Sequence, residues 1–147
     1  MSTRAIITFR NEMFDPVCCI YKHYDGYIDG LGHSLAEWLT QMTIINGIAS
    51  GEETHDYANG IGCLAAKWIA DNKTKTGDVY LCAYGDYQDY NYDVIMQPND
   101  GSRSHKMKTD DCIRIEIRKY DEPDLLFSGS PSELLNFNED DEDSSTS

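Results

Sequence analysis

Alternation of apolar and polar residues near the start of the chain predicts a β-hairpin. In residues 3–10 the side chains alternate in the manner of a strand with one face on the core. Residues 11–16 predict a turn closed by Asp15-Pro16, and residues 17–21 are apolar enough for a central strand. We expect the two strands to pair and to present the polar segment that follows them at the end of the hairpin.

Two helices are predicted next, each from an apolar stripe at helical spacing. Ser34 and Glu37 have the spacing of a capping box, so the first helix is expected to start at Leu35, with Asn46-Gly47 as its stop. Its stripe is Leu35, Trp38, Leu39, Met42 and Ile45. The second helix is expected from about Gly60. Its stripe is Ile61, Leu64, Ala65, Trp68 and Ile69.

Strand patterns dominate the rest of the chain. Residues 78–84 and 90–96 flank a short polar turn and predict a second hairpin. Residues 113–118 alternate strictly and predict a strand with one buried and one wet face, and residues 125–127 predict a short edge strand. Residues 130–133 form a second capping box with proline at the first helical position, so a short helix is expected there.

These elements predict a single α+β domain over residues 1–137, in the order ββααβββ plus a short C-terminal helix. The expected sheet is mostly antiparallel, with about five strands and two helices packed on one face. Residues 138–147 lack apolar side chains and are expected to form a disordered acidic tail.

Composition narrows the classes of partner and compartment. The formal net charge of −14 opposes direct binding to nucleic acid, where Lys and Arg supply the affinity. An acidic surface can instead meet a basic protein, mimic nucleic acid, or simply keep the chain soluble. No signal peptide or membrane-spanning run is visible, so we expect a cytoplasmic protein without a membrane partner. Five cysteines without CxxC spacing predict reduced thiols.

The most unusual segment is residues 21–34, YKHYDGYIDGLGHS, which gathers tyrosines, histidines and glycines before a helix. Glycine backbones can bring N–H groups close to an anion, with Lys22 and His23 as further donors and tyrosines as walls. The alternative is a polar turn whose glycines only reverse the chain. The expected ligand-binding residues are Tyr21, Lys22, His23, Tyr24, Asp25, Gly26, Tyr27, Gly30, Gly32 and His33, joined by Asn59 and Gly60.

Asn59 and Gly60 are included because they open the second helix, and two glycine-rich helix starts can converge on one anion. The alternative is that small residues here permit close packing of the helix on the sheet. No Cys/His pair has zinc-ligand spacing, and the glycines match neither GxGxxG nor a Walker motif, so no metal and no cofactor is expected. A binding protein is favoured over an enzyme, although a small hydrolase using His23, Asp25 and His33 stays open.

Several short motifs occur together along residues 2–130. They are Thr3-Arg4, YKHYDGY at 21–27 with Gly30 and Gly32, Asn46-Gly47, Asn59-Gly60 with CLAA at 63–66, and GDVY at 77–80. This combination resembles an uncharacterised family of small proteins of bacteriophages, bacteria and large DNA viruses. Relatives often have proline after the tyrosine, where this chain has Ile28. The resemblance implies a phage-type accessory protein of a host cytoplasm, of a kind that often blocks a host defence component or its signal.

Residues and resemblance together predict a counter-defence protein that sequesters a small anionic, nucleotide-like ligand through the glycine- and tyrosine-rich loop, because aromatic faces bind bases. One alternative is an acidic inhibitor or nucleic-acid mimic that blocks a host defence protein. The hydrolase is the second alternative. Tyrosine-rich strand faces are compatible with a homodimer.

Overall fold

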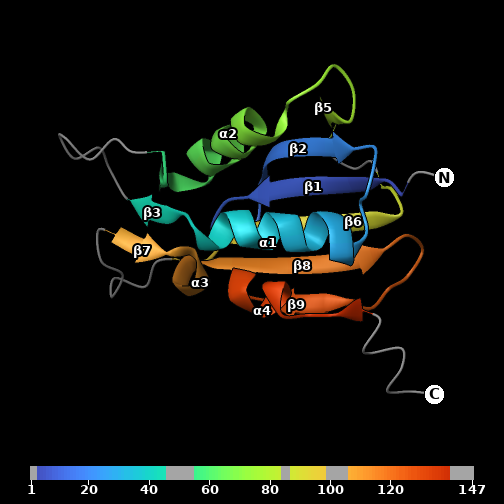
Figure 1. Ribbon diagram of the computed structural model, residues 1–147. Coiled ribbons are helices and arrows are strands. Elements are labelled where there is room, and N and C mark those ends of the chain that lie inside the picture. The colour runs from blue at the N-terminus through green and yellow to red at the C-terminus, as the bar shows by residue number, and fades with distance from the viewer. Residues whose placement is uncertain (1–2, 46–54, 84–86, 99–105, 140–147) are drawn as a thin grey trace.

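A six-stranded mixed sheet forms the body of the protein (Figure 1). The computed structural model describes residues 3–45, 55–83, 87–98 and 106–139. Across the sheet the strands are β5 (Val79–Leu81), β2 (Pro16–Lys22), β1 (Ala5–Arg10), β6 (Tyr90–Met96), β8 (Ile113–Lys119) and β9 (Phe127–Gly129). Strands β1 and β6 run parallel, and the other neighbouring pairs run antiparallel, including the predicted β1–β2 hairpin. The class is therefore α+β with a mostly antiparallel sheet.

A second sheet of three strands was not predicted. Its order is β4 (Tyr57–Asn59), β3 (Thr43–Ile45) and β7 (Lys106–Lys108). Strand β3 runs parallel to β4 and antiparallel to β7. Figure 1 shows this sheet at the left end of the molecule, beyond the end of the first α-helix. The predicted order ββααβββ is therefore incomplete.

The helices lie on one face of the large sheet (Figure 1). They are the π-helix η1 (Ile28–Gly32), α1 (His33–Thr40), α2 (Gly60–Asn72), the single turn α3 (Thr109–Cys112) and α4 (Pro131–Leu135). The predicted start of α2 at Gly60 is confirmed. The capping box of α4 is also confirmed, because the side chains of Ser130 and Glu133 each accept a hydrogen bond from the other residue's backbone N–H.

The first α-helix differs from its prediction at both ends. The helix runs on directly from η1 and starts at His33 with no side-chain cap, so the predicted box of Ser34 and Glu37 is not used. It ends at Thr40 instead of Ile45. All three residues of β3 are β-branched, which favours a strand, and they pair with residues of β4 and β7. The predicted stop at Asn46-Gly47 lies outside the described residues.

The predicted hairpin of residues 78–84 and 90–96 is wrong. Strand β5 pairs with β2 at the edge of the sheet, whereas β6 lies between β1 and β8. The side chains of Tyr80 and Leu81 are 48% and 73% exposed, which suits an edge strand. In contrast, every residue on one face of β6 is buried. Strands β1 and β8 pair with β6 on its two sides and hold it in the middle of the sheet, beneath the helices.

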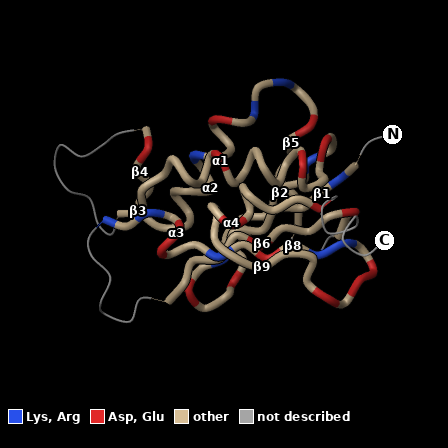
Figure 2. Tube along the Cα trace, turned by 60° about the horizontal axis from the view of Figure 1, so that its bottom comes forward, with Lys and Arg blue, Asp and Glu red and all other residues tan. Residues whose placement is uncertain are grey.

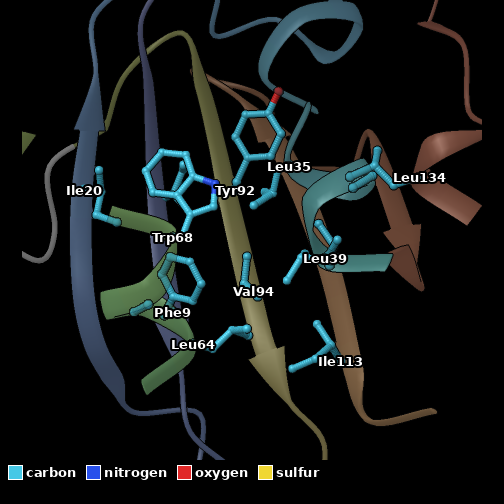
Figure 3. Packing of buried hydrophobic residues seen from close by; sticks show 14 of the residues in the cluster. Phe9, Ile20, Leu35, Leu39, Leu64, Trp68, Tyr92, Val94, Ile113 and Leu134 are labelled. Atoms are coloured by element: carbon cyan, nitrogen blue, oxygen red, sulfur yellow. The ribbon is translucent and has the colours of Figure 1, made fainter. Parts of the chain in front are cut away.

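The hydrophobic core lies between the large sheet and the helices (Figure 3). From the sheet it contains Phe9, Ile20, Tyr92, Val94 and Ile113, and from the helices Leu35, Leu39, Leu64, Trp68 and Leu134. Each of these side chains is at most 2% exposed. Burial of that kind contributes about 1.5–3 kcal/mol per large apolar side chain, which is enough to fix α1 and α2 on the sheet.

The chain remains in contact with the large sheet as far as Glu139. Its carboxylate lies 2.9 Å from Lys119 Nζ and accepts a hydrogen bond of 3.0 Å from Tyr90 Oη. Burial and the neighbouring Glu139 together raise the pKa of Tyr90 to about 12. Residues 140–147 of the expected acidic tail lie outside the described residues. No helix in the described part of the chain is long and apolar enough to cross a membrane.

Candidate functional site

The side of the large sheet opposite the helices carries mostly polar residues, and we call it the polar face. Strand alternation places Arg4, Ile6, Thr8 and Arg10 on this side, because Ala5, Ile7 and Phe9 belong to the core. Their cross-strand partners on the polar face include Cys19, Tyr21, Asn91, Asp93 and Ile95. Charges in the middle of this face are paired with each other, as in the 2.8 Å contact between Arg10 Nε and Asp93 Oδ1.

Four aromatic rings line a shallow concavity of about 520 Å³ at one end of the polar face. The ring centroids of His23 and Tyr24 are 4.5 Å apart in an edge-to-face arrangement. The ring of Tyr21 lies 5.8 Å from His23 and 5.9 Å from Tyr80. The backbone at residues 77–78 completes the lining. We call this site the aromatic concavity.

Pairing of β5 with β2 creates the aromatic concavity. In the antiparallel register Tyr80 lies opposite Tyr21, so both rings project from the same face of neighbouring strands. The register continues past the end of β2, where the backbone N–H of His23 donates to the carbonyl of Asp78 at 2.8 Å. The site therefore depends on a contact between two segments that are distant in sequence.

Asp78 holds the two segments together. Its Oδ2 lies 2.6 Å from Lys22 Nζ, and its Oδ1 accepts a 3.0 Å hydrogen bond from the backbone N–H of Tyr24. Its φ is +76°, a left-handed conformation that Asp tolerates better than most residues. Burial acts to raise the pKa of Asp78, but the bonds from Lys22 and Tyr24 and the charges of Lys22 and Lys75 outweigh burial, so the pKa lies below its usual value.

Histidine 23 presents a hydrogen-bonding group at the concavity. Its Nδ1 lies 2.7 Å from the Oη of Tyr21. When the Tyr21 hydroxyl donates to Nδ1, the proton of the neutral imidazole resides on Nε2. Nε2 has no hydrogen-bond partner among the described residues, so it can donate to an acceptor in the concavity.

Lys73 and Lys75 border the aromatic concavity, and extension of the β1–β2 register places Arg4 opposite His23. Both lysines belong to the loop between α2 and β5, where Figure 2 shows Lys and Arg positions in blue. Lys73 Nζ lies 5.1 Å from the ring centroid of Tyr80 and donates to backbone carbonyls of its own loop and of Val79 in β5. Lys75 Nζ lies 5.8 Å from the ring of Tyr24. Arg4, on the polar face, is exposed. Within the described residues neither Lys75 nor Arg4 forms an ion pair.

The glycines of the loop face the protein and make close packing possible. A Cβ at Gly26 would lie 2.8 Å from the Cβ of Ala5 and 2.9 Å from the backbone oxygen of Thr3. The carbonyl of Gly26 accepts a 2.8 Å hydrogen bond from Tyr92 Oη in the core. Cβ atoms at Gly30 and Gly32 would likewise meet neighbouring protein atoms. These contacts are those of a tightly packed turn.

Other residues of the predicted loop are engaged in contacts of their own. The ammonium of Lys22 binds Asp78 and the carbonyl of Tyr24. The carbonyl of Asp25, a residue with φ of +58°, accepts a 2.8 Å bond from the backbone N–H of Leu31. His33 Nε2 lies 2.6 Å from the carbonyl oxygen of Phe137. Tyr27 is 40% exposed and is not among the residues that line the aromatic concavity.

Asn59 and Gly60 lie away from the other predicted site residues. Asn59 ends β4 and Gly60 starts α2; β4 pairs with β3, and β3 follows the C-terminal end of α1. The loop of residues 23–32 precedes the N-terminal end of the same helix. The two glycine-rich helix starts therefore lie at opposite ends of α1 and do not converge, as Figure 1 also shows.

The aromatic concavity also contains residues that the sequence did not indicate. These are Gly77, Asp78 and Tyr80, with Lys75 at the edge. The only local signal was the Gly-Asp pair at the start of a strand, since Asp and Gly mark backbone turns. Nothing local connects this pair to Tyr21, because β5 and β2 are far apart in sequence.

In the part of the chain that the structure describes, no group of three or more His, Cys, Asp and Glu side chains could hold a metal ion. No family model, curated protein or solved structure matches the chain.

Proposed function

We propose that this protein binds a small anionic, nucleotide-like ligand in the aromatic concavity and does not convert it. The observation that carries the proposal is the presence of two cations, Lys75 and Arg4, without ion pairs in the described residues, beside four aromatic rings. The chain has 26 acids and 12 bases, so cations that form no close ion pair are notable in it and are available to an external anion. Aromatic rings stack on bases, and cations bind phosphate.

We propose the following roles for the groups at the site. The rings of Tyr21 and Tyr80 form the platform for a planar base, since the two side chains lie side by side. The ammonium of Lys75 and Nε2–H of His23 bind the phosphate. Asp78 binds no ligand and holds the Lys22–Tyr24 segment in place.

Binding without turnover is favoured by the positions of the residues that a hydrolase would use. The hydrolase hypothesis needs His23, Asp25 and His33 around one reacting atom. His33 instead contacts the carbonyl of Phe137, and the backbone of Asp25 closes the turn with Leu31. Of the three residues that the hydrolase needs, only His23 lines the aromatic concavity.

The resemblance to phage and viral proteins gives the proposal a biological setting. We propose a counter-defence protein of a host cytoplasm, whose ligand is a nucleotide-like signal of the host. The formal charge of −14 favours a second candidate, an acidic inhibitor that binds a basic host defence protein. Binding of that kind is expected to weaken when salt is raised or when residues 138–147 are deleted.

A thermal-shift and calorimetry experiment tests the first candidate. Nucleoside 5′-monophosphates are added at about one hundred times Kd, which stabilises the folded state by about 2.7 kcal/mol and raises Tm by roughly 5–10 °C in a chain of this size. Tyr80→Ala is expected to weaken binding about tenfold, because stacking on one ring contributes about 1–3 kcal/mol. Lys75→Ala is expected to weaken it about fivefold.

Matched controls come from the opposite end of the molecule. Tyr57 and Lys106 form a similar pair, with Lys106 Nζ 5.3 Å from the Tyr57 ring. Tyr57→Ala and Lys106→Ala should leave the Kd unchanged. A panel of mononucleotides that neither shifts Tm nor gives heat, or equal losses in the site and control variants, would refute the proposed function.

A further inference from the structure

A second concavity, of about 450 Å³, lies on the polar face beside β6 and β8, whereas the aromatic concavity lies beside β2 and β5. Tyr87 and Tyr120 line it and are 66% and 65% exposed. Asn91 and Arg118 also line it. Large aromatic side chains left this exposed beside a concavity are available to a planar ligand. We call this site the second concavity.

Strand register connects the two concavities. Tyr21 of the aromatic concavity pairs with Ile6 of β1, and Ile6 pairs with Asn91 of β6. Asn91 in turn pairs with Arg118 of β8, which lines the second concavity. Three inter-strand spacings separate Tyr21 from Arg118, which is roughly 14 Å at about 4.8 Å each. One elongated ligand can span this distance.

Arg4 lies between the two concavities. Arg4 precedes Ala5, which pairs with Lys22 on one side and with Tyr90 on the other. Extension of the register by one residue places Arg4 between His23 and Asp89. The carbonyl of Asp89 accepts a hydrogen bond from the backbone N–H of Tyr120, so Tyr120 comes next across the sheet. The Asp89 carboxylate accepts a 3.1 Å hydrogen bond from the backbone N–H of Arg4, not from its guanidinium. Within the described residues that guanidinium is unpaired, so it can bind a phosphate placed between the two sets of rings.

We propose that the two concavities are subsites for one ligand with two planar rings joined by a phosphate linker, that is, a dinucleotide. This inference rests on the proposed function and specifies its ligand. One base stacks in the aromatic concavity, the linker phosphate binds Arg4, and the second base lies against Tyr87 and Tyr120. Asp121 and Glu122 line the second concavity as well, and neither forms an ion pair among the described residues. The two cations of the lining are paired, Arg118 with Asp93 at 3.7 Å and Lys119 with Glu139 at 2.9 Å. A terminal phosphate is therefore disfavoured there, and an internal phosphate at Arg4 is preferred.

A dinucleotide gains affinity over a mononucleotide because its second base binds in an intramolecular step. Stacking of one base on an aromatic side chain corresponds to about a tenfold change in Kd. A mononucleotide, in contrast, occupies the aromatic concavity alone and makes no use of Tyr120.

Isothermal titration calorimetry with the full chain tests the inference. The probes are the four ribonucleoside 5′-monophosphates and the four matching linear homodinucleotides. At least one dinucleotide is expected to bind about tenfold more tightly than its mononucleotide. Tyr120→Ala should abolish this difference and leave the mononucleotide Kd unchanged, whereas Tyr80→Ala should weaken both ligands.

Arg4→Gln tests the position of the linker and is expected to weaken the dinucleotide at least fivefold. Its matched control is Arg114→Gln, which removes an equal charge from an arginine of β8 that is paired with Glu116. Equal Kd values for mononucleotide and dinucleotide, or a Tyr120→Ala variant that keeps the difference, would overturn this inference and leave the proposed function standing. Absence of binding by all eight probes would overturn both.

Discussion

Replacement of Gly26 by alanine separates the two interpretations of the glycine-rich loop. If the glycines serve packing, Gly26→Ala should reduce stability, because the new Cβ would lie 2.8 Å from Ala5 Cβ and 2.9 Å from the backbone oxygen of Thr3. Neither neighbouring atom can rotate away. If the glycine instead brings backbone amides to a ligand, the same substitution should reduce affinity in a protein of parental stability.

The expected size of the effect follows from three contributions. Overpacking costs about 1–3 kcal/mol, since the backbone of residues 25–27 must move away from β1. That movement also weakens the hydrogen bond from Tyr92 Oη, a side chain 1% exposed, to the Gly26 carbonyl, at a cost of about 1 kcal/mol. Alanine also lowers the conformational entropy of the unfolded chain, which raises the free energy of unfolding by about 0.4–1 kcal/mol. The free energy of unfolding should therefore fall by about 1–3.5 kcal/mol.

Gly62→Ala is the matched control, and its expected effect has the opposite sign. Gly62 lies inside α2, and a Cβ there would meet only Val17 Cγ1, at an ordinary 3.8 Å. Alanine is the better helix former by about 0.8–1 kcal/mol, so this variant should be more stable than the parent.

Urea unfolding followed by circular dichroism measures both variants, and calorimetry with a mononucleotide is run where each is folded. The packing explanation requires a lower urea midpoint for Gly26→Ala, a higher one for Gly62→Ala, and a mononucleotide Kd within about twofold of the parent for both. A Gly26→Ala variant with an unchanged midpoint and lost binding would refute it.

Two further predictions concern titrating side chains. Asp78→Asn should lower the free energy of unfolding at pH 7 by about 1–3 kcal/mol, because the carboxylate bonds to Lys22 and Tyr24 are charge-assisted. The folded-state pKa of Asp78 lies below its ordinary value of 3.8, so its contribution to stability is complete above pH 3.8 and is lost as pH falls through the lowered pKa. Parent and variant should therefore converge in urea titrations at low pH. The pKa of His55 is raised above 6.5 by hydrogen bonds to Asp71 and Asp56 and by their charges, so the stability it contributes is complete below pH 6.5 and lost as pH rises through the raised value. Asp71→Asn should bring the NMR titration midpoint of His55 back towards 6.5, and an unchanged midpoint would contradict the assignment.

Local patterns in the sequence were sufficient for elements whose partners are nearby. The capping box at Ser130 and the stripe starting at Ile61 depend on residues three to eight positions apart, and both gave the observed helices. The apolar stripe of α1 continued through Ile45, but β3 ends that helix because β4 and β7 supply hydrogen-bond partners. No pattern inside residues 35–45 indicates those partners.

The candidate site shows the same division. The loop sequence pointed to Tyr21, His23 and Tyr24, which do line one concavity. Tyr80 completes it through the pairing of β5 with β2, whereas the short polar turn predicted after residue 84 had favoured a hairpin with residues 90–96. No sequence pattern indicates how close other atoms lie to a glycine. Only the short distances to Ala5 and Thr3 distinguish a packed turn from an open cradle.

For an acidic protein to bind an anion, the cations at the site must attract the ligand more strongly than the net negative charge of the protein repels it. At physiological ionic strength the Debye length is about 8 Å, so most of the −14 charge is screened from a ligand held in the aromatic concavity. Lys75 would contact a mononucleotide directly, as Arg4 would contact a linker phosphate, and such close contacts are screened less. Added salt then weakens these close contacts and also the long-range repulsion, so the mononucleotide Kd should change little between low and physiological salt. An acidic inhibitor of a basic protein has long-range attraction in place of repulsion, and its complex should weaken steeply over the same range. The salt dependence of binding thus distinguishes the two candidate functions.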